Sequence, residues 1–142
     1  MIRLMLPADI ATEWERISPV LEPAVEVDET RQMSDVYRDL MSGDFALFDV
    51  EHDGDKAIVV VEISQSSVNS KCLWLVYVAG HIGSYAPRAW IGHMRNWSQW
   101  FQDIARALNC TEIRIKGRDW SKVFPDWECV DPDWHELRKE LV

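Results

Sequence analysis

The stretch that decides the fold reads, from residue 71 to residue 116, KCLWLVYVAGHIGSYAPRAWIGHMRNWSQWFQDIARALNCTEIRIK. Residues 72–78 are almost continuously apolar, which is typical of a central strand covered on both faces. The glycine-bearing loop 80–84 follows, and apolar residues spaced four and three apart then predict a helix from about 88 to 108. Residues 111–116 predict another strand. This order indicates a crossover between two parallel strands.

Helices are predicted on the N-terminal side of this stretch. Asp9 is a plausible N-cap, and helical apolar spacing continues to about Leu21, where two prolines weaken the end. The acidic segment Glu22–Gln32 is predicted to be a loop. Ser34 then caps a second, short helix that Gly43 ends.

Strands are predicted between these helices and the opening stretch. The sequence Asp53-Gly54 separates two β-rich runs, which is a strong hairpin signal. With a first strand near the N-terminus, the predicted strands cover residues 2–5, 45–51 and 56–63. The expected fold class is α+β, a mixed sheet of antiparallel hairpins plus one parallel crossover, with helices packed on both faces.

The C-terminal segment is predicted to be a separate short helix. We expect one domain over residues 1–130 and a helix over 131–142 that begins with Asp131 as N-cap. Trp134, Leu137 and Leu141 would share one face of it. The chain has eight tryptophans, which serve either as core residues or as binding hot spots. This face therefore predicts either docking onto the domain or an interface with a protein partner or a second copy.

Composition excludes several functional classes. The net charge of −9 disfavours nucleic-acid binding, which needs cations against phosphates. The sequence has no apolar run near the length that crosses a bilayer, so we expect no membrane association and a soluble, cytoplasmic protein. The three cysteines have no paired spacing, so no metal site is expected.

The charge is distributed unevenly along the chain. Residues 1–86 have 6 basic and 15 acidic groups, whereas residues 87–122 have 7 basic and 3 acidic groups. The one cationic stretch therefore follows the glycine loop. It suits an anionic ligand, although scattered arginines on a solvated helix face are an equal alternative.

Three segments show a resemblance to a known family. They are Trp14-Glu15-Arg16-Ile17-Ser18-Pro19, the run from Leu40 to Phe48, and the run from Ala105 to Ile115 followed by Gly117-Arg118-Asp119-Trp120. With the order of elements, the chain resembles the GCN5-related N-acetyltransferase (GNAT) family over most of residues 10–127. It is most similar in character to short GNAT-like proteins of phages and prophages. That likeness implies the cytoplasm of a host cell, or association with a virion.

The resemblance implies a site for acetyl-CoA. In the family, backbone N–H groups of a loop before the long helix hold the pyrophosphate, and the matching loop begins at Gly80. The implied cofactor-binding residues are Val78, Gly80, Ile82, Gly83, Ser84 and Arg88. Two positions depart from the family pattern, since Gly80 replaces a Gln or Arg and Tyr85 replaces a small residue.

Catalytic candidates follow from the same resemblance. The reaction needs a base for the amine and an acid for the leaving thiolate. The family tyrosine is absent from residues 119–124, which leaves Tyr77 and Tyr85 as substitutes and Glu62 or His81 as a base. Each has a simpler alternative: Tyr77 in the core, Glu62 facing water at its strand end, His81 in a solvated loop.

Two functions are therefore consistent with the sequence. One is an acetyl-CoA-dependent N-acetyltransferase acting on an unknown amine. The other is a GNAT-like structural or interaction module whose acyl-CoA site has degenerated. The departures in the loop and the missing tyrosine favour the second.

Overall fold

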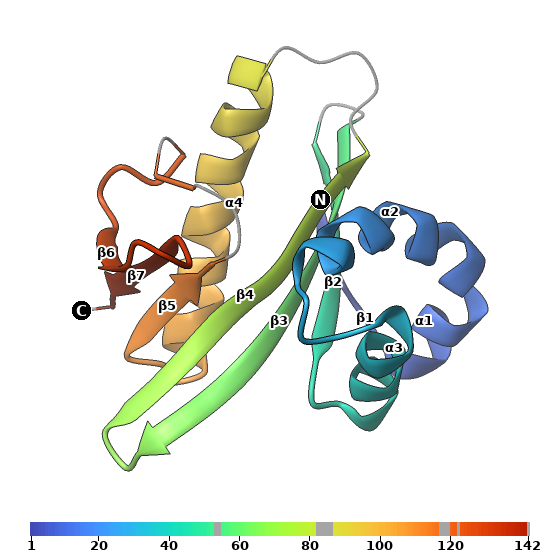
Figure 1. The fold of residues 1–142 in the computed structure, drawn as a ribbon, viewed down its shortest axis with the longest axis horizontal. Coiled ribbons are helices and arrows are strands. Elements are labelled where there is room, and N and C mark those ends of the chain that lie inside the picture. Colours follow the sequence, from blue (N-terminus) through green and yellow to red (C-terminus); the bar gives the residue numbers. More distant parts are fainter. Residues whose placement is uncertain (53–54, 82–86, 117–119, 122, 142) are drawn as a thin grey trace. The chain divides into compact units, whose positions relative to one another are not determined.

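The computed structural model describes residues 1–52, 55–81, 87–116, 120–121 and 123–141, and it divides the chain into two compact units. The first unit comprises Met1–Glu62 and Val76–Gly83, and the second comprises Ile63–Leu75 and Ser84–Val142. The two longest strands, β3 (Asp55–Ser67) and β4 (Ser70–His81), contribute to both units (Figure 1).

The first unit is a four-stranded arrangement with three helices. Its strands follow the order β1-β2-β3-β4, in which β1 (Ile2–Met5) pairs antiparallel with β2 (Ala46–His52) and β2 pairs antiparallel with β3. The helices are α1 (Pro7–Thr12), α2 (Trp14–Val27) and α3 (Met33–Ser42). The pairing of His52 with Asp55 agrees with the hairpin predicted at 53–54, positions that themselves lie outside the described residues.

The first helical region differs from the prediction in both its start and its end. It begins at Pro7 rather than after Asp9, and it breaks at Glu13 into α1 and α2. Helix α2 continues through Pro19 and Pro23 to Val27, so the loop predicted from Glu22 was wrong over its first residues. A proline inside a helix costs about 3 kcal/mol, but α2 buries Ile17, Leu21, Ala24 and Val25 along one face. Burial of that face outweighs the lost backbone hydrogen bonds.

The cap of α3 is also different from the prediction. Gln32, not Ser34, is the N-cap, because Gln32 and Asp35 form a reciprocal capping box. At the other end, Gly43 takes the left-handed conformation with φ of 85°, as predicted for the residue that ends this helix.

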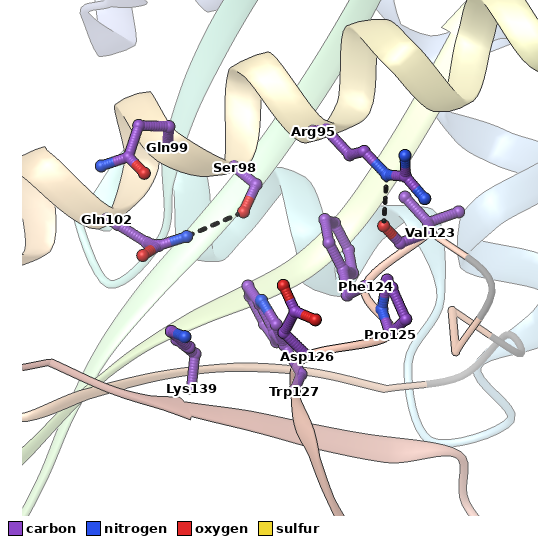
Figure 2. Close-up of a pocket in the computed structure, with 10 residues that line it drawn as sticks. All are labelled: Arg95, Ser98, Gln99, Gln102, Val123, Phe124, Pro125, Asp126, Trp127 and Lys139. Carbon is purple, nitrogen blue, oxygen red and sulfur yellow. Dashed lines mark hydrogen bonds between the residues drawn. The ribbon is translucent and has the colours of Figure 1, made fainter.

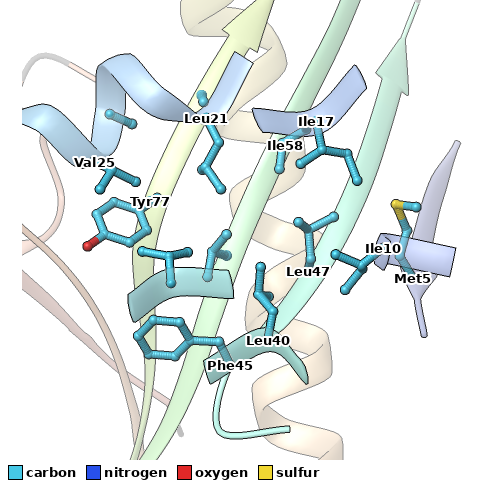
Figure 3. Packing of buried hydrophobic residues seen from close by; sticks show 14 residues of the cluster. Met5, Ile10, Ile17, Leu21, Val25, Leu40, Phe45, Leu47, Ile58 and Tyr77 are labelled. Carbon is cyan, nitrogen blue, oxygen red and sulfur yellow. The ribbon is translucent and has the colours of Figure 1, made fainter. Parts of the chain in front are cut away.

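The core of the first unit lies between its helices and its strands (Figure 3). Helix residues such as Ile17 and Leu40 pack with strand residues such as Leu47 and Ile58, all of them at most 3 % exposed. Tyr77 of β4 belongs to this core and is 4 % exposed. The prediction of Tyr77 as a core residue on a central strand is therefore confirmed.

The second unit contains the parallel crossover. Helix α4 (Pro87–Ala107) leads to β5 (Glu112–Ile115), which pairs parallel with β4, as predicted. Asn109 follows α4 with φ of 61°, which agrees with its predicted role as the terminating residue. The strand order is β3-β4-β5-β7-β6. With its mostly antiparallel pairs, one parallel pair and helices, the chain has the expected α+β class.

The predicted C-terminal helix was wrong. Residues Glu128–Asp131 form β6 and Glu136–Glu140 form β7, an antiparallel pair joined at the bend where His135 has φ of 51°. Strand β7 supplies the backbone partners that one edge of β5 requires, and Leu137, opposite Ile115, becomes 4 % exposed. Trp134 stays 67 % exposed, so Trp134 and buried Leu137 do not form the predicted helical face.

Candidate functional site

The predicted site residues fall on β3, β4 and the connection after β4. Glu62 lies on β3, while Tyr77, Val78 and Gly80 lie on β4. Val78 is buried and Gly80 is exposed. His81 and Arg88 belong to β4 and α4, but their side chains lie outside the described set. Residues 82–86, which include Ile82, Gly83, Ser84 and Tyr85, lie outside the described residues altogether.

Tyr77 and Glu62 belong to a cluster of polar side chains in the first unit. The Tyr77 hydroxyl donates a hydrogen bond to Oδ2 of Asp28 at 2.6 Å. Arg31 lies 3.5 Å from the same Oδ2 through Nη1 and 4.0 Å from Oε2 of Glu62 through Nη2. Two predicted residues on neighbouring strands are thus linked through two residues of the connection between α2 and α3. We call Asp28, Arg31, Glu62 and Tyr77 the polar cluster.

Local structure explains how Asp28 reaches this position. The Thr30 backbone N–H and hydroxyl both donate to Oδ1 of Asp28, at 3.0 and 2.5 Å, so the chain turns directly after α2. The other carboxylate oxygen is then available to Tyr77 and Arg31.

The electrostatics of the cluster follow from these contacts. Burial alone would raise the pKa of Asp28, but the hydrogen bonds from Thr30 and Tyr77, with the charge of Arg31, outweigh it and lower that pKa. Burial and then the hydrogen bond to Asp28 raise the pKa of Tyr77, which keeps the phenol neutral. A neutral phenol already bonded to a carboxylate is poorly suited to taking up or releasing protons during a reaction.

Arg31 connects the cluster to the apolar core. Its guanidinium carbon lies 5.0 Å from the centre of the Phe45 ring, a cation–π contact. Burial would lower the pKa of Arg31, but the polar and charged groups around it, Tyr77 first and then Asp28 and Glu62, raise that pKa instead. Arg31 therefore remains a permanent cation between the two carboxylates.

Glu62 is the more accessible of the two carboxylates in the cluster, since the Asp28 side chain is 24 % exposed. The Glu62 side chain is 35 % exposed, and its 4.0 Å separation from Arg31 is longer than a hydrogen bond. Arg31 is the cation within ion-pair distance of Glu62 among the residues that the structure describes. Glu62 can therefore accept a hydrogen bond from an incoming ammonium group or take a proton from it.

Sequence reasoning did not find Asp28 and Arg31. Both lie in the acidic segment predicted to be a loop, where their spacing matches no catalytic motif. The one local signal was Asp28 two residues before Thr30, which favours a turn held by the aspartate side chain. Their link to β4 depends on contacts between residues 49 positions apart.

The described residues hold no group of three or more His, Cys, Asp and Glu side chains that is placed to bind a metal ion. Likewise, none of the described helices combines the length and apolarity needed to cross a bilayer.

Comparisons with known proteins give a result at the level of fold. No family model matches the sequence, and no curated protein matches it. The chain is similar to the crystal structure of an aminoglycoside 6′-acetyltransferase type Ii, with a TM-score of 0.67 and 8 % identity over 100 % of this chain and 97 % of the other. It is also similar to a GNAT-family acetyltransferase from Listeria monocytogenes 4b F2365, with a TM-score of 0.56 and 13 % identity over 99 % and 94 % of the two chains.

A third similar structure is the N-acetylglutamate synthase from Neisseria gonorrhoeae in complex with coenzyme A and L-arginine. The TM-score is 0.56 and the identity is 15 %; the match covers 99 % of this chain but 33 % of that one. At these identities the likeness establishes a GNAT-like fold.

Proposed function

We propose that this chain is an acyl-CoA-dependent N-acyltransferase whose acceptor is a cationic amine. The observation on which this rests is the accessible carboxylate of Glu62, the member of the polar cluster that lies on β3 of a GNAT-like fold. Two of the similar structures are acetyltransferases that the chain matches over nearly their full length. Fold alone does not establish activity, so the argument for a reaction depends on the cluster.

The charge distribution supports a cationic acceptor. Residues 1–86 have 15 acidic and 6 basic groups, and the described part of the first unit is drawn from this region. A field of that sign concentrates ammonium groups near the surface. Glu62 is then the carboxylate best placed to hold the amine, and to accept the proton that the nitrogen must lose before it attacks a carbonyl carbon.

Bound acyl-CoA would supply the activated acyl group. Among the predicted cofactor-binding residues, Val78 and Gly80 are described, and both follow Tyr77 on β4. In this proposal Tyr77 is a positioning residue. Its hydrogen bond to Asp28 fixes the connection after α2, which in turn places Arg31 next to Glu62.

One experiment tests both binding and turnover. Acetyl-CoA is titrated into the protein by calorimetry, and acetylation of spermidine and of a lysine-rich peptide is followed by mass spectrometry. We expect product from the wild type and loss of product, with acetyl-CoA binding retained, in Glu62→Gln. Glu29→Gln is the matched control, because it removes the same charge from an exposed position outside the cluster. Equal product from Glu62→Gln and wild type would refute the role of Glu62.

A second candidate is a non-catalytic interaction module with a degenerate acyl-CoA site. The observation that favours it is Trp134, a large apolar side chain that is 67 % exposed at the turn between β6 and β7. Absence of heat with millimolar acetyl-CoA would support this candidate over the enzyme. Sizing chromatography of wild type and Trp134→Ala then tests self-association, since an unchanged elution volume contradicts a dimer formed through Trp134.

A further inference from the structure

The second unit contains a cavity that takes no part in the proposed acyl transfer. Its volume is about 410 Å³, and it lies between α4, the segment 123–127 and β7 (Figure 2). A volume of this size matches the lower range of sites for small organic molecules. None of the residues of the polar cluster lines it.

Two buried polar side chains of α4 face the cavity. Ser98 and Gln102 are 5 % and 8 % exposed, and they are the buried polar residues of the described chain. The Gln102 amide nitrogen donates a hydrogen bond to the Ser98 hydroxyl oxygen at 3.1 Å. The Gln102 carbonyl oxygen and the Ser98 hydroxyl each have capacity for a further hydrogen bond. A ligand in the cavity could therefore bind to these two side chains.

An aromatic wall lies across from these groups. The rings of Phe124 and Trp127 are stacked with centroids 4.5 Å apart and an angle of 20° between their planes. Arg95 of α4 donates a hydrogen bond from Nε to the Val123 carbonyl at 3.2 Å, which ties this segment to the helix. The wall is therefore a fixed apolar surface, suited to a flat ring.

Lys139 is one of two cations that line the cavity, the other being Arg95. It sits opposite Ile113 in the pairing of β7 with β5, and Figure 2 shows its side chain directed toward the cavity below Gln102. Lys139 makes no hydrogen bond or ion pair with the residues that the structure describes. The neighbouring Arg138, in contrast, forms ion pairs with Glu112, Glu128 and Glu140. Because Lys139 has no counter-ion among the described residues, it can form a charge-assisted hydrogen bond with an anion in this cavity.

Asp126 limits the charge of that anion. Its side chain also lines the cavity but is exposed. Its carboxylate disfavours a second negative charge nearby. Arg95 also lines the cavity, but it already donates to the Val123 carbonyl. A monoanion with a planar apolar part therefore matches Lys139, Asp126 and the aromatic wall.

We propose that this cavity binds a small aromatic monocarboxylate. The carboxylate accepts hydrogen bonds from the Lys139 ammonium and the Ser98 hydroxyl, and the ring lies on the wall of Phe124 and Trp127. This site goes beyond the proposed acyl transfer and does not depend on it.

Benzoate is the probe, and its uncharged isostere benzamide tests the need for charge. Two-dimensional ¹H–¹⁵N NMR of the full chain follows the titration. We expect saturable shifts of the Ser98, Gln102 and Trp127 signals with benzoate, and binding weaker by about tenfold or more in Lys139→Gln. Lys139→Arg should keep the affinity within a few-fold, because the charge is retained.

Lys56→Gln is the matched control, since it removes one lysine from an exposed strand position of the first unit. It should bind benzoate as the wild type does. Three results would each overturn the proposal: no saturable shift, equal binding of benzamide, or an unchanged affinity in Lys139→Gln with a native spectrum. If Lys139→Gln does not fold, loss of binding in folded Ser98→Ala supports the site, and unchanged binding there overturns it.

Discussion

The hydrogen bond between Tyr77 and Asp28 joins β4 to the connection after α2, so removing it should lower the free energy of unfolding. Replacing Tyr77 with phenylalanine removes one hydroxyl and leaves the buried ring in place, so no cavity forms. Hydrogen bonds to charged groups contribute about 1.5–3 kcal/mol. The Asp28 side chain is 24 % exposed and retains its bonds from Thr30, so water can partly replace the phenol. We therefore expect Tyr77→Phe to lower the free energy of unfolding by about 1–2 kcal/mol, at the lower end of that range.

Urea unfolding followed by circular dichroism measures this change. With a typical slope of about 2 kcal/mol per molar urea, the midpoint should fall by about 0.5–1 M. Tyr37→Phe is the matched control, because Tyr37 packs edge-on against Trp14 and its hydroxyl has no bonding partner among the described residues. Its unfolding free energy should change by less than about 0.5 kcal/mol.

A double-mutant cycle with Asp28→Asn isolates the interaction energy between Tyr77 and Asp28. Acidification provides a second test of the same interaction. The folded-state pKa of Asp28 is lowered, so its stabilising contribution is complete above the ordinary aspartate pKa. The contribution is lost as the pH falls through the lower, folded-state value. The wild type should therefore lose its advantage over Asp28→Asn on acidification below about pH 4. A coupling energy near zero at neutral pH, or equal effects of Tyr77→Phe and Tyr37→Phe, would refute the reasoning.

Three further predictions concern other parts of the chain. Burial raises the pKa of the Cys72 thiol to about 12, so native protein treated with N-ethylmaleimide at pH 8 should be modified at the exposed Cys129 long before Cys72, as mass spectrometry of peptides would show. Leu137→Ala should lower the unfolding free energy by about 2–4 kcal/mol, whereas Trp134→Ala should change it by less than about 0.5 kcal/mol; a reversed order in urea unfolding would contradict the strand assignment of β7. Gly43→Ala should cost about 1 kcal/mol in the same assay, because φ is 85° while a Cβ would meet no atom within 4 Å.

The elements with strong local signals were predictable from the sequence. Helix α4 has a long apolar stripe and a terminating Asn109, and β2 and β3 flank an Asp-Gly pair. These signals lie within a few residues of the structure that they specify. They also fixed the parallel pairing of β4 with β5, because the connection between the two strands is long enough to form a crossover.

The errors arose where distant contacts decide between local alternatives. The spacing of Trp134, Leu137 and Leu141 fits one helical face. In the structure, however, Leu137 lies in β7, where it pairs with Ile115 of β5. A segment of this length has little helical stability of its own. Similarly, α2 persists through its prolines because the buried face is fixed by the strands beneath it, which local propensity does not describe.

In the candidate site too, local sequence signals and contacts between distant residues contributed differently. Sequence reasoning placed Tyr77 and Glu62 as acid and base of one reaction, but it could not show a physical link between them. In the structure Asp28 accepts the hydrogen bond from Tyr77, and Arg31 lies within ion-pair distance of both Asp28 and Glu62. The two residues differ in the structure, because the Tyr77 hydroxyl is bonded to Asp28 while the Glu62 side chain is 35 % exposed. In the proposed acyl transfer Tyr77 is therefore a positioning residue, and amine binding would depend on whether Arg31 leaves the outer face of the Glu62 carboxylate open to an incoming ammonium group.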